Sequence, residues 1–109
     1  MKTYVFDIDG TICISKNSNY EKSEPITSRI NKINDLYKEG NIIIFHTARG
    51  MGRYKNNVSD AEAEFYELTI KQLSDWKVKY HYLFMGKPSG DLYIDDKGVS
   101  DEDFFNTRN

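Results

Sequence analysis

The chain has little cysteine and no long hydrophobic run. Cys13 is its single cysteine among 109 residues, which excludes an internal disulfide and a thiolate metal cage. No apolar run approaches the roughly 20 residues of a membrane span, and Asp7 interrupts the amino-terminal apolar run too early for a secretion signal. We therefore expect a cytoplasmic protein that does not enter a membrane.

An excess of charge of one sign is also missing. Lys and Arg total 15 and Asp and Glu total 17, a formal net charge of −2, which argues against non-specific binding of nucleic acid. Hydrophobic residues make up 39% of the chain, enough to build a core. A chain of 109 residues is the size of one small domain, so we expect a single globular domain over residues 1–109 without a second lobe.

The apolar pattern predicts strands that alternate with helices, an order typical of a parallel α/β sheet. Ser59 with Glu62 is expected to cap the second helix, and Ser100 with Asp103 a short last one. Only six residues, 85–90, separate the last two strands, fewer than a parallel crossover needs, so one of them should be short, distorted or antiparallel. The predicted strands are 3–8, 41–46, 80–84 and 91–95, and the longer helices are 25–39 and 59–77. The polar segment 13–24 is expected to be a surface loop or a small hairpin, and 48–57 a loop.

Two carboxylates come at the end of the first predicted strand, in the run Asp7-Ile8-Asp9-Gly10-Thr11. Because side chains alternate along a strand, Asp7 and Asp9 should point to the same side. Open α/β sheets bind their ligands at the carboxyl ends of strands, and Gly10 would let backbone amides approach an anion closely. By itself such a pair is common in turns, so residues elsewhere decide its meaning.

Three further polar sets follow later predicted strands: Thr47, Lys87 and the pair Asp95-Asp96. In a parallel sheet they should converge on the edge that holds the first two carboxylates. Unpaired like charges gathered there would be destabilising. A divalent cation and a phosphate would balance them, which favours a site for phosphate chemistry.

These four motifs, in this order, resemble those of the haloacid dehalogenase superfamily of phosphohydrolases over nearly the whole chain. The resemblance implies a Rossmann-like three-layer sandwich with a mostly parallel central sheet, and Mg²⁺-dependent hydrolysis of a phosphomonoester. It makes Asp7 the nucleophile that forms an aspartyl phosphate, and Asp9 the general acid and then the base. Thr47 would donate to a phosphoryl oxygen, and Lys87 would neutralise the phosphate and orient Asp7. The implied metal ligands are Asp7, the main-chain carbonyl of Asp9 and Asp96, with Asp95 in support.

Substrate selection in this superfamily usually depends on a cap domain inserted after the first or second motif. The segments from Asp9 to Thr47 and from Thr47 to Lys87 are each filled by a loop, a helix and a strand, so no cap fits. Stretches 45–51 and 86–97 resemble small capless phosphatases encoded with bacterial capsule-biosynthesis genes, which implies a small phosphorylated sugar or polyol as substrate. Loops 13–24 and 48–57, or a neighbouring subunit of a homo-oligomer, would cover the site. The candidate substrate contacts are Gly10, Thr11, Ala48, Arg49 and Arg53, the two arginines because a guanidinium offers a fork of donors.

Three other functions share some of these residues. A receiver domain of two-component signalling also uses acids, a Thr and a Lys followed by Pro, but the second and third strands here end without an aspartate to phosphorylate. A polynucleotide 3′-phosphatase would need a basic surface, whereas residues 91–103 alone contain six acids. A catalytically silent binding protein would keep the fold, yet none of the motifs is eroded.

Overall fold

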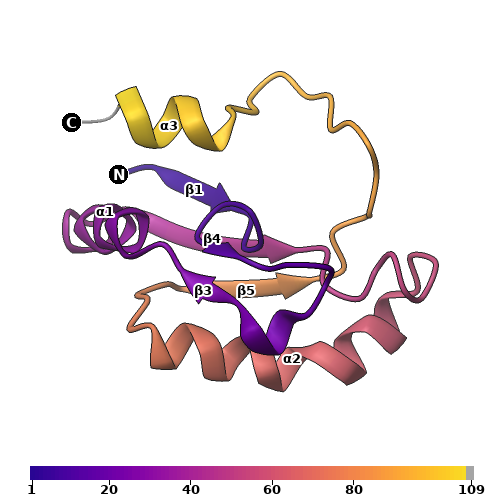
Figure 1. Cartoon of the computed structure of the whole chain (residues 1–109). Helices are drawn as coiled ribbons and strands as arrows, with labels where there is room; N and C mark the ends of the chain where they lie inside the picture. The colour runs from indigo at the N-terminus through magenta and orange to yellow at the C-terminus, as the bar shows by residue number, and fades with distance from the viewer. Residues whose placement is uncertain (108–109) are drawn as a thin grey trace.

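The computed structural model describes residues 1–107 and confirms a parallel α/β sheet (Figure 1). Strands β1 (Thr3–Phe6), β4 (Ile42–Thr47) and β5 (Tyr82–Met85) form it in the order β1-β4-β5, and both neighbouring pairs are parallel. A separate antiparallel ribbon pairs β2 (Cys13–Ile14) with β3 (Glu24–Pro25). The apolar run of β4 therefore occupies the centre of the sheet.

Three α-helices and one 3-10 turn complete the described fold. Helix α1 (Thr27–Lys38) connects β1 to β4, α2 (Val58–Asp75) connects β4 to β5, and α3 (Asp101–Thr107) follows β5 after a long segment. The 3-10 helix η1 (Tyr20–Lys22) lies between the strands of the ribbon. Among residues 1–107, no helix has the length and apolar character needed to cross a membrane.

The ends of two helices show which capping predictions hold. The side chain of Asn57 accepts a hydrogen bond from the backbone amide of Asp60 at 3.1 Å, so the cap of α2 lies two residues before the predicted cap at Ser59. Asn is as good an N-cap as Ser, and the earlier residue satisfies the first free amides of the helix. For α3 the prediction is confirmed, because Ser100 Oγ accepts from the amide of Asp103 at 3.2 Å.

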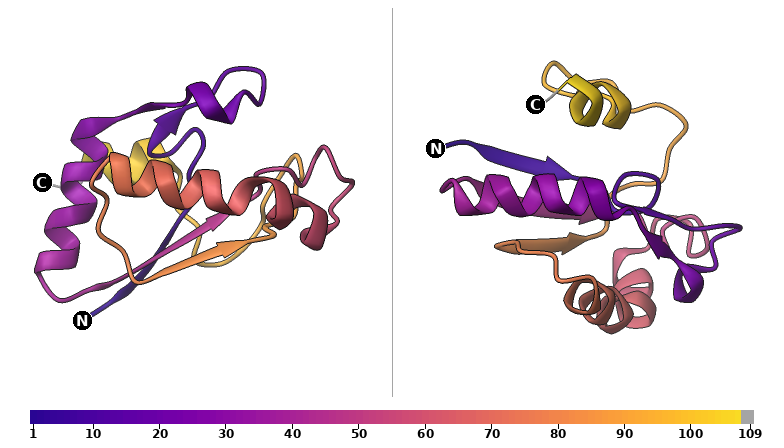
Figure 2. Two further views of the ribbon diagram at one scale, coloured as in Figure 1. Left: turned by 90° about the horizontal axis from the view of Figure 1, so that it is seen from below. Right: turned by 60° about the vertical axis from the view of Figure 1, so that its left-hand side comes forward.

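All three helices cover the same face of the sheet. The buried side chains of the strands, such as Phe6 and Phe45, share one core with Ile33 of α1, Leu73 of α2 and Phe105 of α3. The two crossovers step across the sheet in the same direction, and right-handed crossovers then put both connecting helices on one side (Figure 2). The third layer of the expected sandwich is therefore not found within residues 1–107.

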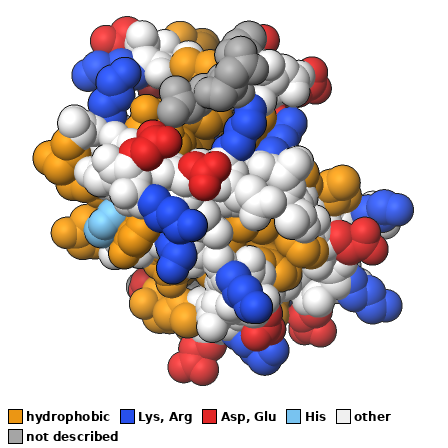
Figure 3. Space-filling view, turned by 90° about the vertical axis from the view of Figure 1, so that its left-hand side faces the viewer, with side chains coloured by type: hydrophobic (Ala, Val, Ile, Leu, Met, Phe, Trp, Pro, Cys, Tyr) orange, Lys and Arg blue, Asp and Glu red, His pale blue; other side chains and the backbone are white. Residues whose placement is uncertain are grey.

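The opposite face of the sheet carries apolar side chains at the surface. Val5 is 63% exposed, Tyr82 56% and Phe84 52%, and the last two rings stack on each other. Figure 3, which looks from the amino ends of the strands, shows hydrophobic side chains gathered at the left of that view. A parallel sheet is usually covered on both faces, so this exposure departs from the common pattern.

The strand predicted at 91–95 is wrong. Residues 86–100 form no helix or strand, and Leu92 and Ile94 are 80% and 91% exposed. The link after β5 is too short for a parallel crossover, and the segment instead runs from the carboxyl end of β5 across to α3 (Figure 1). The apolar run 92–94 therefore pairs with no strand of the sheet.

Candidate active site

The carboxyl end of β1 places Asp7 and Asp9 in the wall of a cavity of about 510 Å³. A tight turn follows at once, in which Gly10 has a φ of +82° and the amides of Thr11 and Ile12 donate to the carbonyl of Ile8. Loop residues Ala48, Arg49 and Arg53 line the same cavity. Two predicted carboxylates and three predicted substrate contacts are thus brought together.

Lys87 reaches this site from the segment after β5. Its Nζ lies 3.8 Å from Asp7 Oδ1 and 4.4 Å from the centre of the Tyr93 ring, a cation–π distance. Its backbone amide donates to the carbonyl of Thr47 at 3.0 Å, which holds the segment against the end of β4. Burial raises the pKa of the Asp7 carboxyl, and the neighbouring ammonium partly opposes that rise.

Thr47 and His46 occupy opposite faces at the end of β4. Thr47 is buried on the helix-covered face, and its Oγ1 accepts a hydrogen bond from the amide of Arg49 at 3.2 Å. The hydroxyl proton is not used by that bond. His46 is half-buried, and burial lowers its pKa.

Arg49 forms a bidentate ion pair with Asp9. Its Nε donates to Oδ2 at 2.9 Å and its Nη2 to Oδ1 at 3.0 Å. The Arg49 side chain has 0% of its surface exposed, whereas the Asp9 side chain keeps 23%. The guanidinium therefore lies behind the carboxylate, and the carboxylate stands between it and the cavity opening.

Arg53 is the more exposed arginine of the loop. Its side chain is 51% exposed and pairs with Glu64 of α2 through Nη1 at 2.6 Å. Gly50 allows the loop to lie close against α2, because its φ is +78° and a Cβ at this position would stand 2.7 Å from the ring of Phe65. Thr11 uses its main-chain carbonyl to accept from Arg29 Nη1 at 3.1 Å.

Asp95 and Asp96 lie on the exposed segment after β5. The Asp95 carboxylate accepts from the amide of Lys97 at 2.5 Å, a local turn contact. Across residues 1–107, no three acidic, histidine or cysteine side chains are grouped so that they could hold a metal ion. The structure does not bring this pair together with Asp7 and Asp9.

No protein-family model matches the sequence, and no curated protein matches it. Among solved structures, a structural-genomics target protein from Vibrio cholerae is 29% identical, with a TM-score of 0.88 over 96% of this chain and 88% of that one. A chain of the Pnkp1/Rnl/Hen1 complex is 19% identical, with a TM-score of 0.60 over 86% of this chain and 30% of the other. The D,D-heptose 1,7-bisphosphate phosphatase of B. bronchiseptica, complexed with magnesium and phosphate, is 13% identical, with a TM-score of 0.55 over 84% and 52%.

The chain has the α/β fold that these solved structures share. It spans about half the length of the heptose bisphosphate phosphatase and 30% of the Pnkp1/Rnl/Hen1 chain. At these identities the likeness concerns the fold alone. What the site does must be argued from its own residues.

The residues of this site meet only part of what magnesium needs. The carboxylate of Asp7 and the main-chain carbonyl of Asp9 are the hard oxygen donors that Mg²⁺ prefers. The third predicted carboxylate, Asp96, is not gathered with them in the part of the chain described. As placed, the donors do not make a complete magnesium site. The reaction steps are therefore assigned to the residues of the chain alone.

Several residues that build the site belong to none of the sequence motifs. Polar Gln72 and Thr69 interrupt the apolar stripe of α2, and this was a signal, since such positions need partners when buried. Tyr93 is 57% exposed and its ring lies beside the Lys87 ammonium. The other unpredicted cavity residues are Ser18, Tyr20, Gly50, Gly52 and Ser89.

Cys13 sits beside the site but is chemically protected. Its thiol is fully buried and lies 3.4 Å from Asp9 Oδ1, and burial together with this carboxylate raises the pKa of the thiol to about 11. We expect native protein at pH 8 to react with a thiol reagent about 100-fold more slowly than urea-unfolded protein, because the thiolate is the reactive form. Labelling rates followed by mass spectrometry test this, and equal rates in the two states would contradict it.

Proposed function

We propose that this chain is a phosphomonoester hydrolase that works through an aspartyl phosphate on Asp7. The observation that carries the proposal is the juxtaposition at the cavity: Asp7 with the Lys87 ammonium 3.8 Å away, and Asp9 in the same wall. A nucleophilic carboxylate beside a fixed cation suits attack on a negatively charged phosphoryl group. The haloacid dehalogenase-like fold supports the same chemistry.

The proposed reaction has two displacement steps at phosphorus. In the first, a carboxylate oxygen of Asp7 bonds to phosphorus and the bond to the leaving oxygen breaks. Asp9, which pairs with Arg49 as a carboxylate and takes up a proton from the phosphomonoester monoanion, gives that proton to the leaving oxygen. In the second, water attacks phosphorus and loses a proton to Asp9, while the bond to Asp7 breaks. The products are the alcohol and inorganic phosphate, and both carboxyls return to their starting states. Magnesium, if it bound to the Asp7 carboxylate and the main-chain carbonyl of Asp9, would supply positive charge to the phosphoryl oxygens.

The proposed substrate is a small phosphorylated sugar or polyol, handled by a single domain without a cap. A cavity of about 510 Å³ falls within the range of small-molecule sites. Its walls come from the 13–24 and 48–57 loops, through Tyr20 and Arg53 among others. The resemblance of stretches 45–51 and 86–97 to capsule-associated phosphatases supports the same substrate class.

A polynucleotide 3′-phosphatase is the second candidate. The structural likeness to a chain of an RNA repair complex supports it. Against it stand the six acids of residues 91–103, five of which are exposed, because an acidic surface repels a phosphate backbone. The substrate experiment therefore includes a 3′-phosphorylated oligonucleotide.

The test is phosphate release from a panel of sugar phosphates, polyol phosphates, nucleotides and the oligonucleotide, with MgCl₂ present. We expect turnover of at least one sugar or polyol phosphate, and loss of that turnover when EDTA removes the metal. Preference for the oligonucleotide would move the assignment to the second candidate. No release from any phosphomonoester would overturn the proposal.

The variant Asp96→Asn tests whether Asp96 contributes to the magnesium requirement. If Asp96 joins the metal ligands during turnover, this variant should need more than ten times the wild-type MgCl₂ for half-maximal activity. The matched control is Asp91→Asn, a neighbouring exposed acid in the same segment. An unchanged magnesium requirement in Asp96→Asn would remove this residue from the metal site.

A further inference from the structure

We infer that Arg49 is a positioning residue: it sets the orientation of the Asp9 carboxylate and does not grip the substrate. The inference rests on the proposed function for the role of Asp9. It rests on this structure for everything that concerns Arg49. It also departs from the sequence-based prediction that Arg49 binds substrate.

The hydrogen-bonding capacity of Arg49 is already used inside the protein. A guanidinium has five N–H donors. Two go to Asp9, through Nε and Nη2, and Nη1 supplies two more, to Gln72 Oε1 at 2.6 Å and Thr69 Oγ1 at 3.2 Å. The fifth, on Nη2, points to Ser23 Oγ at 3.5 Å. No donor is left for a phosphate, and the side chain exposes no surface to one.

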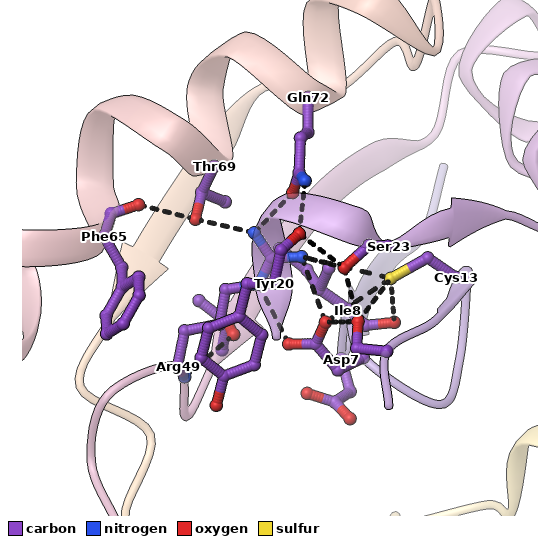
Figure 4. A network of polar contacts seen from close by, with 12 residues as sticks. Asp7, Ile8, Cys13, Tyr20, Ser23, Arg49, Phe65, Thr69 and Gln72 are labelled. Carbon is purple, nitrogen blue, oxygen red and sulfur yellow. Dashed lines mark hydrogen bonds and ion pairs between the residues drawn. The ribbon is translucent and has the colours of Figure 1, made fainter. Parts of the chain in front are cut away.

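The residues that hold Arg49 are themselves held. Gln72 uses its other end to donate from Nε2 to the carbonyl of Tyr20 at 2.6 Å, and Thr69 donates to the carbonyl of Phe65 at 2.7 Å. The ring of Tyr20 lies 4.9 Å from the guanidinium carbon, a cation–π contact. The guanidinium is therefore clamped between helix α2 and the 3-10 turn η1, as Figure 4 shows.

This clamp determines how Asp9 meets the cavity. Oδ1 accepts from Arg49, from Ser15 Oγ at 2.5 Å and from Cys13 Sγ at 3.4 Å, so it is crowded on the inner side. Among the described residues, Oδ2 accepts only from Arg49 Nε, which leaves it a lone pair for a proton. A buried guanidinium needs its counter-charge, so Asp9 is fixed in the orientation that a general acid requires.

The experiment compares two substrates whose leaving groups differ in their need for a proton. An aryl phosphate such as p-nitrophenyl phosphate leaves as a weak base, whereas glycerol phosphate must be protonated as it leaves. Displacing a catalytic group by about 1 Å costs on the order of 100-fold in rate. We expect Arg49→Lys, which cannot form the fork, to lose about 100-fold in kcat on glycerol phosphate and under 10-fold on the aryl ester, with KM little changed.

A second variant guards against a folding defect. Gln72→Leu removes one of the two α2 acceptors of Arg49, at a residue that does not line the cavity, and Lys71→Gln is its exposed control on the same helix. We expect Gln72→Leu to show the same leaving-group dependence as Arg49→Lys at smaller size, and Lys71→Gln to match wild type. Equal losses on both esters would indicate a structural role only, and a large rise in KM would indicate substrate binding; either result overturns the inference.

Failure of the proposed function would be visible separately, as no turnover of either ester by wild type. In that case a crystal structure of Arg49→Lys still decides the positioning role. The inference requires the Asp9 carboxylate to turn away from its wild-type orientation in that variant. An unchanged orientation would overturn it.

Discussion

Asp7→Asn is expected to lose about 10⁴-fold or more in turnover, because an amide cannot form the acyl phosphate on which the proposed route depends. The side chain keeps its size and its place beside Lys87, so binding should change less than turnover. Phosphate release under single-turnover conditions measures the effect, and acid-quenched wild type should carry a trapped phosphoryl group that the variant lacks. Full turnover by a folded Asp7→Asn would show that another residue is the nucleophile.

The control for this variant is its stability. The sign of the expected change in the free energy of unfolding follows from the pKa of Asp7. Burial raises the pKa of Asp7, so its ionised form destabilises the native state above that pKa. The cost disappears as the pH falls below the unfolded value of 3.8. In metal-free buffer we therefore expect Asp7→Asn to be at least as stable as wild type in urea at pH 7, with the difference shrinking to nothing near pH 3.

Asp9→Ala is expected to damage both activity and stability. Loss of a general acid and base typically costs about 10²–10⁴-fold in rate. In addition, the variant leaves the Arg49 guanidinium, whose side chain is 0% exposed, without its counter-charge. Breaking a buried pair from one side costs about 3–5 kcal/mol, so urea denaturation should show a large fall in the free energy of unfolding.

The double variant Asp9→Ala/Arg49→Met separates these two effects. Removing both charges replaces the buried pair with apolar groups, which is often close to neutral. We expect it to recover most of the lost stability and none of the lost turnover. If Asp9→Ala were as stable as wild type, or if the double variant were no more stable than the single one, Asp9 would not be the counter-charge of Arg49.

Much of the fold could be predicted because short-range patterns determine it. Strand β4 lies within one residue of its predicted bounds, since four consecutive apolar residues suit a central strand. The spacing of Ile30, Ile33 and Leu36 predicted the buried stripe of α1, and all three are buried. Such patterns depend only on neighbours in the chain.

The failures concern elements that depend on distant partners. Residues 91–95 have a strand-like composition, but a strand exists only where a neighbour pairs with it, and the six-residue link after β5 works against that pairing. The third layer failed for the same reason: which face of the sheet a helix covers follows from strand order. Self-association, which would shield the site or the exposed sheet face, stays a prediction.

The sequence by itself determined that Asp7 and Asp9 share one side of a strand end and that Gly10 turns the chain after them, because strand alternation and a positive φ are local properties. Only the tertiary structure decided what Arg49 does. Its partners on α2 lie 20 and 23 residues further along the chain. Burial removed the guanidinium from solvent, and a buried charge must find its acceptors within the protein. Arg49, which the sequence analysis predicted to bind substrate, therefore orients the Asp9 carboxylate instead.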